Sequence, residues 1–170
     1  MRAHLANAEA VFNYLSNQPL VSKIYYPGDP NNPDYEVAKK QMHGFGAMIS
    51  FELQDGLDPK QFVEQLHVIT LAESLGALES LIEIPALMTH GSIPRDIRLK
   101  NGIKDELIRL SVGVEDQKDL LADLESGFNE LKRSEKNISD SKVHSQAWSG
   151  NPQSFRSSLN LPGDSGPVLV

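Results

Sequence analysis

One arginine stands in the middle of an apolar run, where its charge must be matched. Arg109 lies inside the run Leu107 to Val112, which is typical of a β-strand. Side chains alternate between the two faces of a strand, so Arg109 shares its face with Leu107 and Ser111. A buried guanidinium needs a carboxylate or phosphate partner. The sequence leaves three alternatives for Arg109: an ion pair with one of the chain's 23 acids, an edge strand in water, or an anionic ligand.

Two further polar clusters lie in the same part of the chain. Glu73 and Ser74 follow a β-rich run, and Thr89 and His90 occupy a later loop. Loops at the ends of strands are frequent places for binding and catalytic residues. The segment 71–116 is therefore the candidate site.

Several other chemistries lack the residues that they require. The chain has no cysteine, which excludes disulfides, thiolate catalysis and Cys-based zinc sites. Its five histidines show neither HxH nor HExxH spacing, so we expect no metal site. No GxSxG motif is present. Gly44-Phe45-Gly46 is not followed by Gly-Lys-Ser/Thr and indicates a close backbone approach before a strand, not a phosphate loop.

The composition describes an acidic globular chain. Its 170 residues carry 16 Lys and Arg against 23 Asp and Glu, a formal net charge of −7. That balance argues against a nucleic-acid surface and against a polybasic membrane anchor. Hydrophobic residues make up 39%, enough for a core, and no run approaches 18 apolar residues. The first nine residues lack an apolar signal segment, so we expect no membrane partner and a cytoplasmic location.

Helices and strands alternate along the first 131 residues. Several of the loops between strands are too short for parallel crossovers, which favours an α+β fold with a mostly antiparallel sheet covered by helices. The patterns predict helices over 3–17, 34–42, 58–66, 94–102 and 116–131, and strands over 21–26, 47–53, 67–71, 78–84 and 107–112.

The composition changes after the last predicted helix. Of the 37 residues from 134 to 170, 18 are Ser, Gly, Pro or Asn, and the apolar ones follow no period. We therefore expect residues 132–170 to form a disordered or loosely attached tail. Its apolar end, Val168-Leu169-Val170, is most simply a plain terminus; a C-terminal peptide ligand is the alternative.

Separated motifs occur in a family-specific order. They include Tyr-Pro-Gly at 26–28, Gln-Met-His-Gly-Phe-Gly at 41–46, Leu-Ala-Glu-Ser-Leu-Gly at 71–76, Pro-Ala-Leu-Met-Thr-His at 85–90 and Leu-Ile-Arg-Leu-Ser-Val-Gly-Val-Glu-Asp at 107–116. Over residues 1–131 the chain resembles the C-terminal domain of the Cys/Met-metabolism family of pyridoxal-phosphate enzymes, which includes cystathionine γ-lyases and γ-synthases. Asp29 stands where the family often has Leu, and Ala77 where a second Gly is common.

The resemblance implies roles for four residues. Arg109 would hold the α-carboxylate of the amino-acid substrate, a task suited to a guanidinium. Ser74 would lie beside that carboxylate and contribute mainly its backbone N–H. Glu73 would face the substrate side chain and favour cystathionine-like substrates, and Thr89 would lie near the pocket shared by cofactor and substrate.

The resemblance also implies a fold, a cofactor and partners. It predicts the C-terminal domain of a fold-type I enzyme that uses pyridoxal 5'-phosphate and assembles as a homotetramer. The family's Schiff-base lysine belongs to an N-terminal domain in a Ser-x-Thr-Lys context that no lysine here has. We therefore expect no catalytic residue in this chain, a missing N-terminal domain, and no stable cofactor binding by the chain alone; cofactor-binding residues are unknown. The chain looks like a fragment.

The implied function is part of a transsulfuration enzyme. Such an enzyme acts on C–S bonds of cystathionine-, homocysteine- or cysteine-type amino acids by γ-elimination or γ-replacement, with the cofactor accepting electrons from the substrate. This domain would orient the substrate. The alternative is a non-catalytic remnant or interaction module without activity of its own.

Overall fold

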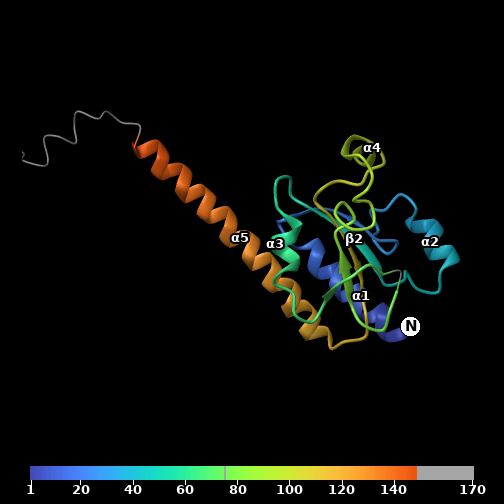
Figure 1. Ribbon diagram of the computed structural model, residues 1–170. Coiled ribbons are helices and arrows are strands. Elements are labelled where there is room, and N and C mark those ends of the chain that lie inside the picture. The colour runs from blue at the N-terminus through green and yellow to red at the C-terminus, as the bar shows by residue number, and fades with distance from the viewer. Residues whose placement is uncertain (75, 149–170) are drawn as a thin grey trace, which may run out of the picture. The chain divides into compact units, whose positions relative to one another are not determined.

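The computed structural model describes residues 1–74 and 76–148 (Figure 1). The chain divides into two compact units, Met1–Lys132 and Arg133–Val170. The first unit holds the whole sheet and every residue of the predicted site.

A five-stranded sheet organises the first unit, in the order β1-β2-β5-β4-β3. Neighbouring strands pair antiparallel except β3 and β4, which run parallel. A mostly antiparallel sheet with helices confirms the predicted fold class. The strands are β1 (Val21–Tyr25), β2 (Met48–Leu53), β3 (Thr70–Leu71), β4 (Leu81–Glu83) and β5 (Leu107–Ser111).

The helices begin where local chemistry favours them. The predicted start at Asp58 is confirmed, because its side chain accepts a hydrogen bond from the Lys60 amide and Pro59 occupies the first helical position. The helices are α1 (Arg2–Ser16), α2 (Tyr35–Gln41), α3 (Pro59–Val63), α4 (Arg95–Lys100) and α5 (Gln117–Trp148).

The core lies on one face of the sheet. Alternation along the strands directs Ile49, Phe51, Ile108 and Leu110 to that face, where all four are fully buried. Aromatic rings then link sheet and helices: Phe62 of α3 lies 6.0 Å from Phe51 and 4.8 Å from Phe128 of α5, centroid to centroid. Residues of α1, α3 and α5 pack into this cluster. Because side chains alternate along a strand, the polar side chains of the same strands lie on the opposite face.

The last helix is longer than the sequence analysis predicts. The expected tail begins at residue 132, but α5 continues to Trp148. Residues 128–148 are polar yet contain neither Gly nor Pro, so no helix breaker interrupts the run. The helix thus replaces the first part of the predicted tail; residues 149–170, including the apolar terminus, lie outside the described residues.

Two predicted strands are shorter than expected. The runs 67–71 and 78–84 yield only the two-residue β3 and the three-residue β4. The backbone N–H groups of residues 67–69 donate to the carboxylate of Asp123 on α5, so they are not available to a sheet ladder. In the described part of the chain, no helix is long and apolar enough to cross a membrane.

Candidate functional site

Arg109 lies in a row of polar residues that crosses the sheet. The register pairs Tyr25 with Ser50, Ser50 with Arg109, and Arg109 with Glu83. Directly paired residues project from the same face, so these four side chains lie side by side on the face opposite the core. β5 lies between β2 and β4, so the edge-strand alternative for Arg109 is wrong.

The Arg109 guanidinium contacts the protein through two of its three nitrogens. Its Nε lies 3.0 Å from Oε1 of Glu83, an ion pair without hydrogen-bond geometry. Its Nη2 donates to the backbone carbonyl of Ser74 at 3.1 Å. Nη1 has no partner among the residues that the structure describes, and the side chain is 25% exposed. Nη1 is therefore available to a ligand, and Nη2 keeps a second N–H beyond the one that it donates to Ser74.

Glu83 is the acid that the sequence analysis did not identify. Only 1% of it is exposed, and its Oε1 accepts from the Thr89 hydroxyl at 3.3 Å. Its Oε2 is buried without a hydrogen-bond partner in the described chain. The Thr89 Oγ1 also lies 2.9 Å from Nδ1 of His90. The sequence pattern contains a clue, because an acid within the apolar run Leu81 to Ile84 can face an arginine within another such run.

The structure brings three of the four predicted site residues together. Arg109 contacts Ser74 directly and Thr89 through Glu83. The Ser74 contact uses its carbonyl, whereas its expected N–H role stays a prediction. Glu73 is exposed and has no partner among the described residues, so its predicted place beside a substrate side chain is also untested.

A second buried acid lies on the same face. Glu52 is 1% exposed; its Oε1 accepts from the Tyr25 hydroxyl at 2.5 Å and its Oε2 from Lys104 at 2.7 Å. Burial opposes ionisation of Glu52, but the hydrogen bonds from Lys104 and Tyr25 outweigh it and lower the pKa of Glu52 below its ordinary value. The same contact raises the pKa of Lys104, while burial and the bond to Glu52 raise that of Tyr25. Both carboxylate oxygens of Glu52 are therefore satisfied.

Carboxylates fix both ends of the segment that carries Glu73 and Ser74. Asp123 accepts three backbone N–H groups of residues 67–69, at 2.7, 3.0 and 2.8 Å. At the other end, Glu115 accepts from the amide of Ser80 at 2.5 Å and from its hydroxyl at 2.8 Å. The loop between them is thus anchored to the body of the unit on each side.

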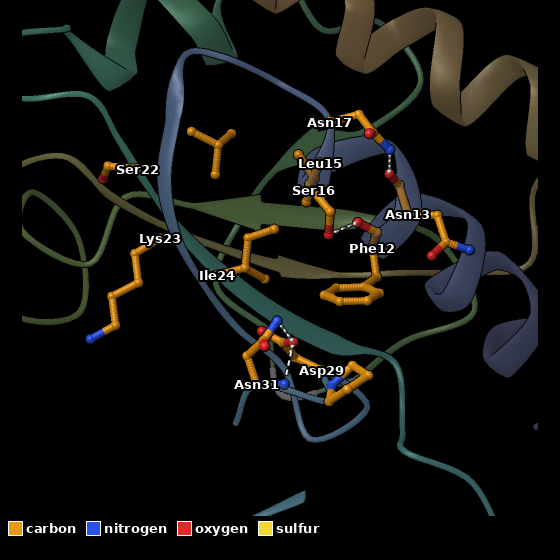
Figure 2. A pocket seen from close by; sticks show the side chains of 12 residues that line it. Phe12, Asn13, Leu15, Ser16, Asn17, Ser22, Lys23, Ile24, Asp29 and Asn31 are labelled. Carbon is orange, nitrogen blue, oxygen red and sulfur yellow. Dashed lines mark hydrogen bonds between the residues drawn. The ribbon is translucent and has the colours of Figure 1, made fainter. Parts of the chain in front are cut away.

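A separate pocket lies between the end of α1, β1 and the loop 29–31 (Figure 2). Its volume is about 420 Å³, and none of the predicted site residues lines it. Several of its polar groups bond to one another: Ser16 donates to the Phe12 carbonyl, and Asn31 donates to Asp29. Because the predicted site residues lie elsewhere, Arg109 stays the centre of the candidate site.

Comparisons with known proteins agree on one family. Residues 1–129 match the family described as Cys/Met metabolism PLP-dependent enzyme. The chain is 57% identical over 128 residues to a cystathionine beta-lyase of Lactococcus lactis subsp. cremoris, covering 75% of this chain and 34% of that protein. It is 52% identical over 124 residues to a cystathionine gamma-lyase of Bacillus subtilis, covering 73% and 33%.

Solved structures give the same result. A cystathionine gamma-lyase from Lactobacillus plantarum, complexed with L-serine, is 73% identical with a TM-score of 0.75, over 78% of this chain and 35% of that one. A cystathionine gamma synthase from Xanthomonas oryzae pv. oryzae, in complex with aminoacrylate and cysteine, is 43% identical with a TM-score of 0.74, over 78% and 35%. The chain thus spans about a third of the length of the relatives that it matches.

Proposed function

The chain belongs to the Cys/Met metabolism family of PLP-dependent enzymes, and we propose that it supplies the part that binds the substrate's α-carboxylate, through Arg109. The relatives named above are cystathionine lyases and a cystathionine synthase. The proposed substrate class is accordingly an amino acid with a sulfur-bearing side chain, and the proposed reaction makes or breaks a C–S bond.

The open edge of Arg109 is the observation that carries this proposal. Glu83 and the Ser74 carbonyl engage Nε and Nη2, which leaves Nη1 and the second Nη2 hydrogen for a ligand. Two parallel N–H groups match the two oxygens of a carboxylate, and such bidentate pairs are among the stronger hydrogen-bonded contacts. The Arg109 side chain is a quarter exposed, so it is accessible from solvent while its Nε is paired with Glu83.

Glu73 is proposed to select among substrates. It is exposed and directly precedes Ser74, whose carbonyl touches Arg109. A carboxylate there favours a substrate with a second ammonium group, as cystathionine has, over one with an apolar side chain. The relatives also include an L-methionine gamma-lyase of Fusobacterium nucleatum.

The described residues fit the amino acid better than they fit the cofactor. Pyridoxal phosphate is bound by an amine and by groups that hold its phosphate. On the polar face of the sheet, Lys104 is paired with Glu52, Lys23 lies 4.5 Å above the Tyr25 ring, and Arg109 is paired with Glu83. Within the part of the chain that the structure describes, this face offers no unengaged lysine and no phosphate cradle. We therefore assign no residue here to the cofactor.

A non-catalytic interaction module is the less favoured alternative. The relatives reported above are named as enzymes, and identity reaches 73% with one of them. An interaction module also gives no reason for a half-buried arginine with an open edge.

A chimeric enzyme tests the proposal. Residues 1–132 of this chain replace the matched third of the Lactobacillus plantarum enzyme, which is 73% identical. If the chain supplies a working substrate-binding part, the chimera cleaves L-cystathionine with kcat/KM within roughly tenfold of the parent, a barrier difference of about 1.4 kcal/mol. A correctly folded chimera that binds the cofactor but does not cleave the substrate would contradict the proposal.

A further inference from the structure

We propose that Glu83 is a positioning residue that orients the Arg109 guanidinium so that its Nη1/Nη2 edge faces an incoming carboxylate. The proposal rests on the function proposed above and adds a residue to it. It concerns how the guanidinium is held before any substrate arrives.

The geometry places Glu83 directly beside Arg109. The two residues are cross-strand partners of β4 and β5, so their side chains start from adjacent points on the same face. Oε1 lies 3.0 Å from Nε, at the root of the guanidinium and not at its tip. A negative charge at that position attracts the guanidinium and leaves the tip for another anion.

A comparison with Glu52 shows that Glu83 is not simply a structural acid. Both glutamates are 1% exposed and both lie on the polar face. Glu52 has a hydrogen bond on each oxygen, at 2.5 and 2.7 Å. Glu83 has one 3.3 Å hydrogen bond on Oε1 and, among the described residues, none on Oε2. A buried carboxylate that is left under-bonded is destabilising, so its presence calls for a role other than stability.

Thr89 acts through Glu83 in this scheme. Its hydroxyl donates to Oε1, the same oxygen that faces Arg109, and its other neighbour is Nδ1 of His90. Thr89 therefore restrains the carboxylate that restrains the guanidinium. Pre-orientation of this kind favours binding, because the arginine does not have to lose its rotamer freedom when the carboxylate arrives.

The order of the Arg109 side chain measures the proposed effect. The full 170-residue chain is labelled with ¹⁵N, and the order parameter of each arginine Nε–Hε bond is measured by NMR relaxation. The Arg109 resonance is identified by its loss in Arg109→Lys. We expect an order parameter near the rigid value of about 0.85 in the unsubstituted chain, and below about 0.6 in Glu83→Gln.

Glu52→Gln is the matched control, because Glu52 is equally buried on the same face and bonds to Tyr25 and Lys104, with no contact to Arg109 among the described residues. It should leave the Arg109 order parameter unchanged, and Glu83→Asp should restore part of the order lost in Glu83→Gln. The proposal is overturned if Arg109 is already mobile in the unsubstituted chain, a result that needs no variant. It is also overturned if Glu83→Gln and Glu52→Gln act alike.

A ligand arm separates this proposal from the proposed function. L-cystathionine is added to the unsubstituted chain and to Glu83→Gln, and the Arg109 Nε–Hε shift is followed. We expect a saturable shift with the unsubstituted chain and an affinity lower by at least threefold with Glu83→Gln. If the Arg109 order parameter depends on Glu83 but L-cystathionine causes no shift, the carboxylate-binding function is contradicted and the positioning role is not. If both proteins bind L-cystathionine with equal affinity, only the positioning role is contradicted.

Discussion

Arg109 has an internal partner and an open edge at the same time. In the sequence analysis, an internal ion pair and an anionic ligand are alternatives for Arg109, as if the guanidinium could bind only one partner. In the structure, Glu83 and Ser74 engage Nε and Nη2 while Nη1 has no partner among the described residues. A guanidinium carries five N–H groups, so the two roles are compatible.

The arginine could be predicted from the sequence, but its acid could not. A charge inside the apolar run Leu107 to Val112 is visible in the pattern. Which of 23 acids faces it depends on the strand register, and the register of β4 against β5 is not encoded in either run alone. The roles expected for Glu73, Ser74 and Thr89 come from family resemblance and stay predictions.

Removal of the Arg109 side chain should destabilise the chain moderately. Arg109→Ala leaves Glu83 buried without its counter-charge, and we expect a loss of roughly 1–3 kcal/mol, the range for leaving a buried polar group unsatisfied. The loss should stay below the roughly 3–5 kcal/mol expected when a fully buried ion pair is broken, because the Arg109 side chain is a quarter exposed. Urea unfolding at pH 7 measures it, and a loss under about 0.5 kcal/mol would match an ordinary surface position instead.

Glu52 should make stability depend on acid pH. Its folded-state pKa is lower than its unfolded value, so its contribution is present above the ordinary glutamate pKa of 4.5 and is lost as the pH falls through the lowered value. The Tm difference between the unsubstituted chain and Glu52→Gln should therefore be larger at pH 7 than at pH 3. Thermal unfolding by circular dichroism measures both; a difference that does not change with pH would contradict the assignment.

At the scale of elements, side-chain carboxylates decide where the strands end. The sequence predicts strands at 67–71 and 78–84 from their apolar residues. Asp123 takes the N–H groups of residues 67–69, and Glu115 takes that of Ser80. Neither contact is visible in a local pattern, because each joins residues more than 30 positions apart. Periodicity could therefore predict that these elements exist, but not their length.

The Asp123 contact can be tested by a single-atom change. Asp123→Asn replaces one accepting oxygen by an amide that cannot accept, and we expect a loss of roughly 1.5–3 kcal/mol, the range for hydrogen bonds to a charged group. Amide hydrogen exchange at residues 67–69 should accelerate. Asp119→Asn, in the exposed first turn of the same helix, is the control and should cost less than about 1 kcal/mol. Equal effects of the two changes would argue against a specific role for Asp123.

At the scale of the whole molecule, the described residues include a proposed substrate-binding arginine but no group that we assign to the cofactor. On the polar face of the sheet, both described lysines, Lys23 and Lys104, are already engaged, and no lysine in the sequence follows Ser-x-Thr. The fold class was predictable from the alternation of elements and the short loops, and the family from motifs spread over residues 26–116. The continuation of the last helix to Trp148 could not be predicted, because the composition of its polar end resembles that of a linker.

The isolated chain should therefore lack turnover. We expect the full chain, incubated with pyridoxal phosphate and L-cystathionine, to release no thiol product above a buffer blank, as followed with a thiol reagent. Turnover that borohydride abolishes and that maps to a lysine of this chain would show that the cofactor site has been misjudged.

Substrate use by the chimera with Arg109→Lys tests the central claim most directly. A lysine keeps the charge of Arg109 but cannot reproduce the two parallel N–H groups that a carboxylate accepts. We expect kcat/KM for L-cystathionine to fall tenfold to a hundredfold, which corresponds to a loss of about 1.5–3 kcal/mol. Arg95→Lys, at a side chain that is 69% exposed, is the matched control and should leave kcat/KM unchanged. If Arg109→Lys retains the full kcat/KM of the chimera, Arg109 does not hold the substrate carboxylate.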